Sequence, residues 1–223
     1  NFKTISIILT IFLSYEIFRS IIPYFQIIEI TDFSFSFSNS LKGVTGNKNI
    51  TAASILIKVP FCFFLYRNSK TNLSRILLFF ILFIATYNIL LLSSRAMMLA
   101  LIIILSLIIV YNLKTKNSVK NILKSVALDL SPFLLSLFIF SIIYSNDETF
   151  SLDQRMSKIN TSDESTNQRL RFYMHGLKHT MSNPFIGVGL GNWKVKSIDY
   201  DSENIISYIV PYHLHNDFLE LGT

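Results

Sequence analysis

The segment 212–222 holds the side chains of this chain that are best suited to chemistry. It contains the imidazoles of His213 and His215, the amide of Asn216 and the carboxylates of Asp217 and Glu220. A neutral imidazole accepts protons readily near neutral pH, because its ordinary pKa lies there. The segment comes just before an expected further membrane span, so we predict proton transfer on a membrane-bound substrate. We also expect the chain to be a piece of a longer protein, with spans missing at both ends.

A metal site is the alternative use of these histidines. Imidazole and carboxylate ligands suit zinc, but no third ligand stands at a suitable spacing. His175 and His179 are four residues apart on a separate predicted helix, and they lack the glutamate of the HExxH zinc pattern. We therefore predict neither a metal nor a cofactor.

Arginines provide a second kind of chemistry, the binding of anions. Arg95 lies between two apolar runs, where it either snorkels to lipid headgroups or faces an anion site inside the bundle. Arg169 and Arg171 are two residues apart on a predicted helix, so they point to different sides, and Arg169 shares a face with Tyr173. For Arg169, a solvated surface arginine is the plain alternative.

Hydrophobic residues make up 51% of the 223 residues, and 20 of them are Phe. A soluble domain of this length could not bury so much apolar surface. Long uncharged runs instead predict an all-α membrane protein, a multi-pass bundle of about five transmembrane helices. The expected spans are 5–28, 50–66, 73–92, 96–113 and 126–144. Glu16 and Arg19 lie inside a span and are expected to pair with each other or with missing helices, while Lys58 either pairs or snorkels.

The net charge of +6 is concentrated in two short loops. One loop holds Arg67, Lys70 and Arg75, the other, at 114–124, holds four lysines, and neither contains an acid. Positive loops lie on the cytoplasmic side of a membrane. We therefore interpret the charge as topology, with contact to membrane lipids, and predict no nucleic-acid partner. Residues 145–223 then form a large external loop that carries the catalytic motifs.

Local patterns predict some structure outside the spans. Ser165 and Gln168 fit a capping box for a helix that runs to about Ser182, with one apolar stripe. Glycines at 187, 189 and 191 indicate tight turns rather than a nucleotide-binding loop. Residues 32–38 alternate with a period of two, which predicts a short strand or an interfacial loop.

Four motifs, in order, resemble those of the O-antigen ligase and polymerase family of bacterial membrane glycosyltransferases. They are the stretch 43–49 before a span, Ser94-Arg95-Ala96 opening a span, Arg169 and Tyr173 followed by the turn Pro184-x-x-Gly187-x-Gly189, and His213-Leu214-His215-Asn216. Tyr173 stands where the family often has Trp. The resemblance covers most of the chain.

The resemblance implies a substrate and a mechanism. Such enzymes transfer a glycan from a polyprenyl diphosphate carrier to another glycan, to lipid A core or to a glycoprotein. They act on the external face of the bacterial plasma (inner) membrane, without metal and with inversion at the anomeric carbon. Arg95 and Arg169 would bind the diphosphate, because arginine forks stabilise the charge of a leaving phosphate. His215 would deprotonate the acceptor hydroxyl and Asn216 would orient it, with His213, Arg171 and Tyr173 as further substrate-binding residues.

Three alternatives remain open from the sequence. An O-antigen or polysaccharide polymerase is the alternative to a ligase within the same family. A transporter or lipid flippase would instead bring Glu16, Arg19 and Lys58 together near the middle of the bilayer, whereas a transferase would bring Arg95, Arg169 and His215 into one external cavity. A sensor or structural membrane protein, whose external domain binds a partner, is the third.

Overall fold

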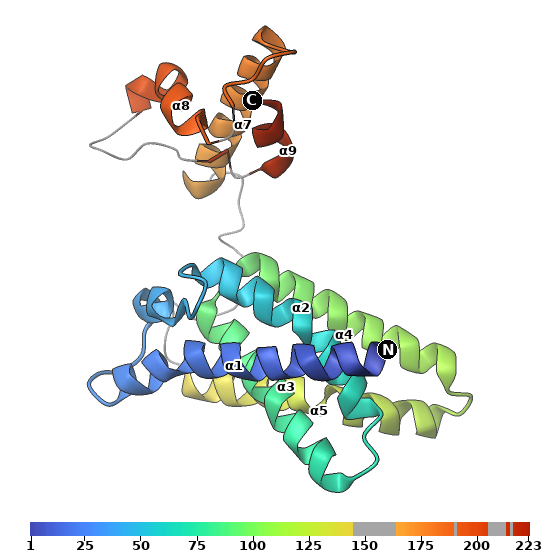
Figure 1. Ribbon diagram of the computed structural model, residues 1–223. Coiled ribbons are helices and arrows are strands. Elements are labelled where there is room, and N and C mark those ends of the chain that lie inside the picture. Colours follow the sequence, from blue (N-terminus) through green and yellow to red (C-terminus); the bar gives the residue numbers. More distant parts are fainter. Residues whose placement is uncertain (145–163, 190, 205–212, 215) are drawn as a thin grey trace. The chain divides into compact units, whose positions relative to one another are not determined.

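The computed structural model describes residues 1–144, 164–189, 191–204, 213–214 and 216–223 (Figure 1). The chain forms two compact units, Asn1–Arg155 and Met156–Thr223. Within the described residues the secondary structure is entirely helical. This confirms the prediction of an all-α fold.

The first unit contains five helices that are long and apolar enough to cross a membrane. This confirms the prediction of about five helices able to span a membrane. The chain is thus a multi-pass membrane protein. The largest difference from prediction is the start of α5, which begins seven residues before the expected position 126, because backbone hydrogen bonding continues past the apolar stretch into polar sequence. The five helices are α1 (Phe2–Ile28), α2 (Lys48–Arg67), α3 (Asn72–Leu92), α4 (Arg95–Thr115) and α5 (Val119–Ile143).

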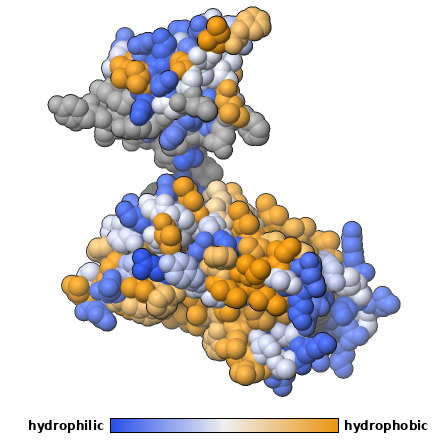
Figure 2. Space-filling model, in the orientation of Figure 1, coloured by the Kyte–Doolittle hydropathy of each residue, from blue (hydrophilic) through white to orange (hydrophobic). Residues whose placement is uncertain are grey.

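Helix α3 lies at the centre of this unit, in contact with α1, α2, α4 and α5. Its C-terminal half is almost completely buried, from Ala85 to Leu92. Figure 2 shows a broad apolar surface over the bundle, with hydrophilic residues gathered where the loop between α4 and α5 lies. That distribution suits a bundle whose sides meet lipid and whose ends meet water.

Charged side chains inside the bundle are paired between helices. Glu16 of α1 forms a salt bridge with Lys58 of α2, with 2.9 Å between Oε2 and Nζ, and Ser54 donates to the same carboxylate. The partner of Glu16 is therefore Lys58 of the neighbouring helix, not Arg19 as one of the expectations had it. At the C-terminal end of α2, Arg67 lies 2.9 Å from Asp129 of α5, and Asn112 of α4 donates to that carboxylate as well. These pairs leave no bare charge facing lipid at these positions, which would be costly.

Residues Phe35–Leu41 form a 3-10 helix, η1, rather than the predicted strand or interfacial loop. Leu41 is fully buried, and its carbonyl accepts a hydrogen bond from Ser20 of α1. Lys48 donates to Ser38. The alternating pattern was misleading because Phe33 packs into the unit, with its ring centroid 5.0 Å from that of Tyr24 and 6.2 Å from that of Phe37.

The second unit contains α7 (Glu164–Ser182), α8 (Trp193–Asp201), the short 3-10 helix η2 (Ser202–Asn204) and α9 (Asp217–Gly222). Helix α7 confirms the predicted helix. The predicted capping box is wrong, because Ser165 lies inside the first turn instead of before it. Helix α7 packs through the face that carries Gly176 and His179. The predicted apolar stripe is exposed in this structure. Its residues Leu170, Met174, Leu177 and Met181 are 51%, 66%, 42% and 81% exposed.

Candidate functional site

Arg95 is the first residue of α4 and stands at the connection from α3. Ser93 ends α3 in the left-handed conformation, with a φ of 55°, and Ser94 is the N-cap of α4. Both serines are buried, whereas Arg95 is exposed. This tight two-residue connection places Arg95 at a helix N-terminus, where the helix dipole adds to the attraction for anions.

Arg169 and Tyr173 lie one turn apart on α7, as predicted. Arg169 is exposed and Tyr173 is half-buried. Among the residues that the structure describes, Arg171 of α7 forms an ion pair with Asp201. Because Arg169 is exposed while Arg171 is paired with Asp201, Arg169 is the more accessible of the two arginines for a phosphorylated ligand.

Arg171 is held by a carboxylate from α8. Its Nε lies 2.9 Å from Oδ1 of Asp201, and its NH2 group donates to Oδ2 at 3.2 Å. The Asp201 side chain is only 3% exposed. A buried carboxylate requires such a partner, so the pair joins α7 to α8. A role for Arg171 in substrate binding stays a prediction.

Two histidines of α7 pack into an aromatic cluster with α8. The Nδ1 atom of His179 lies 3.0 Å from the hydroxyl of Tyr200, whose ring stacks on Trp193. The ring of His175 is 6.0 Å from that of Tyr200. Burial lowers the pKa of His175 below its usual value, and the Asp201 carboxylate opposes this shift in part. These rings join α7 to α8, a role that the sequence pattern did not reveal.

The terminal segment is fixed by Glu220. One carboxylate oxygen of Glu220 lies 2.7 Å from Nδ1 of His213, and the other accepts from the backbone N–H of Leu214 at 3.2 Å. Asn216 caps α9, since its Oδ1 accepts from the N–H of Leu219. His215 itself lies outside the described residues. The neighbouring residues Leu214 and Asn216 are held in place by these contacts, so Glu220 has a positioning role that the sequence did not reveal.

Close packing joins this segment to α7. Leu214 is fully buried, and a Cβ added at Gly176 would come within 2.7 Å of its Cδ1 atom. Thr180 of α7 donates to the carbonyl of Gly222, and the N–H of Val188 donates to the carbonyl of Thr223. We call residues 213–222 the histidine segment. It belongs to the same folded unit as α7, which carries Arg169 and Tyr173. Arg95 belongs to the first unit, so its meeting with Arg169 and His215 stays a prediction.

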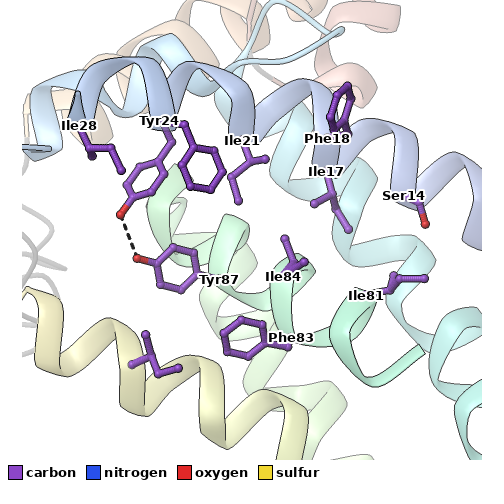
Figure 3. Close-up of a pocket in the computed structure, with 12 residues that line it drawn as sticks. Ser14, Ile17, Phe18, Ile21, Tyr24, Ile28, Ile81, Phe83, Ile84 and Tyr87 are labelled. Atoms are coloured by element: carbon purple, nitrogen blue, oxygen red, sulfur yellow. Dashed lines mark hydrogen bonds between the residues drawn. The ribbon is translucent and has the colours of Figure 1, made fainter. Parts of the chain in front are cut away.

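The first unit contains an open apolar groove between α1, α3 and α5, with a volume of about 540 Å³ (Figure 3). Twelve residues line it: six isoleucines, three phenylalanines, two tyrosines and Ser14. Tyr24 and Tyr87 meet at one end, with their hydroxyls 3.3 Å apart, and the hydroxyl of Tyr144 donates to that of Tyr24. The groove was not predictable from the sequence, because three tyrosines near the ends of separate spans resemble ordinary interfacial aromatics.

The residues expected of a transporter converge only in part. Glu16 and Lys58 do meet. Within the described parts of the chain, the salt bridges do not include Arg19. Lys58 also donates to the hydroxyl and carbonyl of Ser54. An ammonium with this many partners is suited to a fixed interhelical bridge more than to a transport pathway.

The chain matches a known protein family. The family model described as O-antigen ligase matches residues 78–223, which include Arg95, Arg169, Tyr173, His213 and Asn216. No curated protein and no solved structure matches the chain. The matched region is more than half of the chain and carries three of the four motifs that suggested this family. The chain therefore belongs to the O-antigen ligase family of membrane glycosyltransferases, which comprises ligases and polymerases.

Proposed function

We propose that this protein transfers a glycan from a polyprenyl diphosphate carrier to an acceptor hydroxyl, on the external face of the bacterial plasma membrane. The main support is the packing of the histidine segment on α7, through Leu214 and Gly176. It joins the helix that carries Arg169 to the residues next to His215 in the sequence. Family membership supports the same reaction class.

The chemistry requires that negative charge be stabilised on a leaving group. As the bond between the sugar and the phosphate breaks, charge gathers on the diphosphate. Arg95 and Arg169 are assigned to this diphosphate, because both are exposed and one guanidinium group can donate to two phosphate oxygens at once. Binding the donor and the acceptor side by side contributes further to the rate by orientation.

The acceptor hydroxyl must lose a proton as it attacks. His215 is assigned as the base, with the acceptor oriented by Asn216 and His213. Attack by the acceptor oxygen forms its bond to the anomeric carbon while the bond to the diphosphate breaks, and the proton moves to the imidazole. A single displacement of this kind inverts the anomeric configuration, and none of its steps requires a metal.

The side of the membrane follows from the basic loops. Arg67 lies at the end of α2, and Lys114 and Lys116 lie at the end of α4. These ends are assigned to the cytoplasm. The start of α4, with Arg95, and the second unit are then assigned to the external, periplasmic side. Acceptors on that side include lipid A core, a growing glycan or a protein.

Glycan transfer by the full-length protein, reconstituted with a polyprenyl-diphosphate-linked glycan, tests the proposal. Arg95→Ala, Arg169→Ala and His215→Ala are each expected to lower kcat by about 10²-fold or more. Arg75→Ala, on the assigned cytoplasmic side, is the matched control and should retain activity. Full activity in the His215→Ala protein would remove it as the base. A product with one added glycan indicates a ligase, and a ladder of repeats indicates a polymerase.

A further inference from the structure

The apolar groove of the first unit has a buried floor and an exposed rim. Ile17 and Tyr24 form part of the floor and are 5% and 8% exposed, whereas Phe18 and Phe25 form part of the rim. The volume of about 540 Å³ is within the range of ligand-binding pockets. Apart from Ser14 and the tyrosine hydroxyls, the lining side chains are hydrocarbon. Such a surface recognises a hydrocarbon chain.

The groove has a direction. Tyr24, Tyr87 and Tyr144 lie near the C-terminal ends of α1, α3 and α5, and their hydroxyls form a chain of hydrogen bonds there. Ser14 lies ten residues before Tyr24, which corresponds to about 15 Å along a helix, or roughly half of a bilayer's hydrocarbon core. The groove thus runs from the polar end of the bundle toward the middle of the membrane.

The polar end of the groove is also the end at which Arg95 stands. Helix α3 continues for only five residues after Tyr87, and the connection to Arg95 is two residues long. A lipid with a diphosphate headgroup could therefore place its charge at the start of α4 and its first hydrocarbon units between α1 and α3. A phospholipid acyl chain would gain the same apolar contact but would not bring a diphosphate to Arg95.

We propose that this groove binds the isoprenoid chain of the donor lipid, next to its diphosphate. This inference rests on the proposed function and identifies the part of the site that selects the carrier. The methyl-branched chain packs against the isoleucines and phenylalanines of the groove, and the tyrosine hydroxyls mark the boundary between hydrocarbon and headgroup.

Photocrosslinking tests the occupant directly. A photoreactive phenylalanine analogue replaces Phe18 in the full-length protein, in vesicles of phosphatidylethanolamine and phosphatidylglycerol that contain a polyprenyl diphosphate. Phe138 is the matched control, because both side chains are 61% exposed and Phe138 does not line the groove. We expect a polyprenyl adduct at position 18, suppressed by excess unlabelled polyprenyl diphosphate, and little adduct at 138. Equal labelling at both positions, phospholipid adducts alone, or a crosslink to another segment of the protein would overturn the proposal.

Filling the groove provides a second test. Ile84→Trp is expected to raise the KM for the donor about tenfold and to leave kcat largely unchanged. A tenfold change corresponds to the loss of apolar contact by about two buried methylene groups of the isoprenoid chain. Ile103→Trp, at an exposed position of α4 outside the groove, should leave KM unchanged. An unchanged donor KM in Ile84→Trp would contradict the proposal. Labelling without glycan transfer would reject the proposed function alone, and transfer without labelling would reject the groove alone.

Discussion

Replacing Gly176 with alanine tests how α7 and the histidine segment fit together. The new methyl group would lie 2.7 Å from Cδ1 of Leu214 and 3.0 Å from its Cδ2. Ordinary contact begins near 3.4 Å, so Leu214 must withdraw by about 0.7 Å, the difference between 3.4 and 2.7 Å. Leu214 is fully buried and adjacent to His215. Because Leu214 is fully buried, we expect part of this shift to reach its backbone, next to His215 in the sequence.

This displacement should affect activity more than stability. Overpacking costs about 1–3 kcal/mol, but alanine is favoured over glycine in a helix by about 1 kcal/mol. The net loss in the free energy of unfolding should thus be about 2 kcal/mol or less. A displacement approaching 1 Å in a catalytic group can lower a rate about 10²-fold, so we expect glycan transfer to fall at least tenfold. Transfer rate and thermal unfolding, both measured on the full-length protein, separate these effects.

A second substitution makes the prediction sharper. Leu214→Val removes one carbon where Gly176→Ala adds one, so the double variant conserves volume and should recover most of the activity. Lys178→Ala, on the exposed face of α7, is the control and should change neither quantity. Full activity in Gly176→Ala alone, or no recovery in the double variant, would refute the proposed coupling between α7 and the histidine segment.

Three further predictions follow from the same contacts. Glu220→Ala should lower kcat about tenfold with the donor KM unchanged, because His213 and Leu214 lose their shared acceptor. Glu220→Gln, which can still accept from the N–H of Leu214, should recover part of that loss. Equal kcat in the wild type and both variants would contradict a positioning role for Glu220. Glu16→Met and Lys58→Met should each destabilise the bundle by about 3 kcal/mol, because each change leaves the other charge unpaired in the membrane. The double variant should lose less stability than the sum of the two single variants. Additive losses in the free energy of unfolding would exclude the bridge. His175 should titrate in NMR spectra with a pKa below 6.5, so its contribution to stability is present above pH 6.5 and is lost as the pH falls through its folded-state pKa; a midpoint above 6.5 would show that the ring is not desolvated.

The membrane helices could be predicted because an apolar run of about 20 residues has few alternatives to a membrane span. Helix α4, with residues 96–113 almost purely hydrocarbon, illustrates this. Which face of such a helix packs inward could not be predicted. Lipid and protein interior are equally apolar, so the hydrophobic pattern that reveals a buried face in water is lost. The groove between α1, α3 and α5 is one result of packing that the pattern does not encode.

The partners of charged residues were equally hidden. Arg171 and Asp201 are 30 positions apart, and Glu16 and Lys58 are 42 apart. Either pairing depends on the rotation of two helices about their axes, which short-range spacing does not determine. By contrast, α7 was predictable from local signals, namely its period and the Asn183-Pro184 end. The roles of Arg95, Arg169 and His215 came from the family resemblance and remain predictions about chemistry.

A structure of the full-length protein with its polyprenyl-diphosphate-linked glycan would test the central claim most directly. We predict that the guanidinium groups of Arg95 and Arg169 contact the diphosphate oxygens, and that the ring of His215 faces the anomeric carbon from the side opposite the leaving group. A diphosphate bound away from both arginines, or a His215 ring turned toward lipid, would contradict the account.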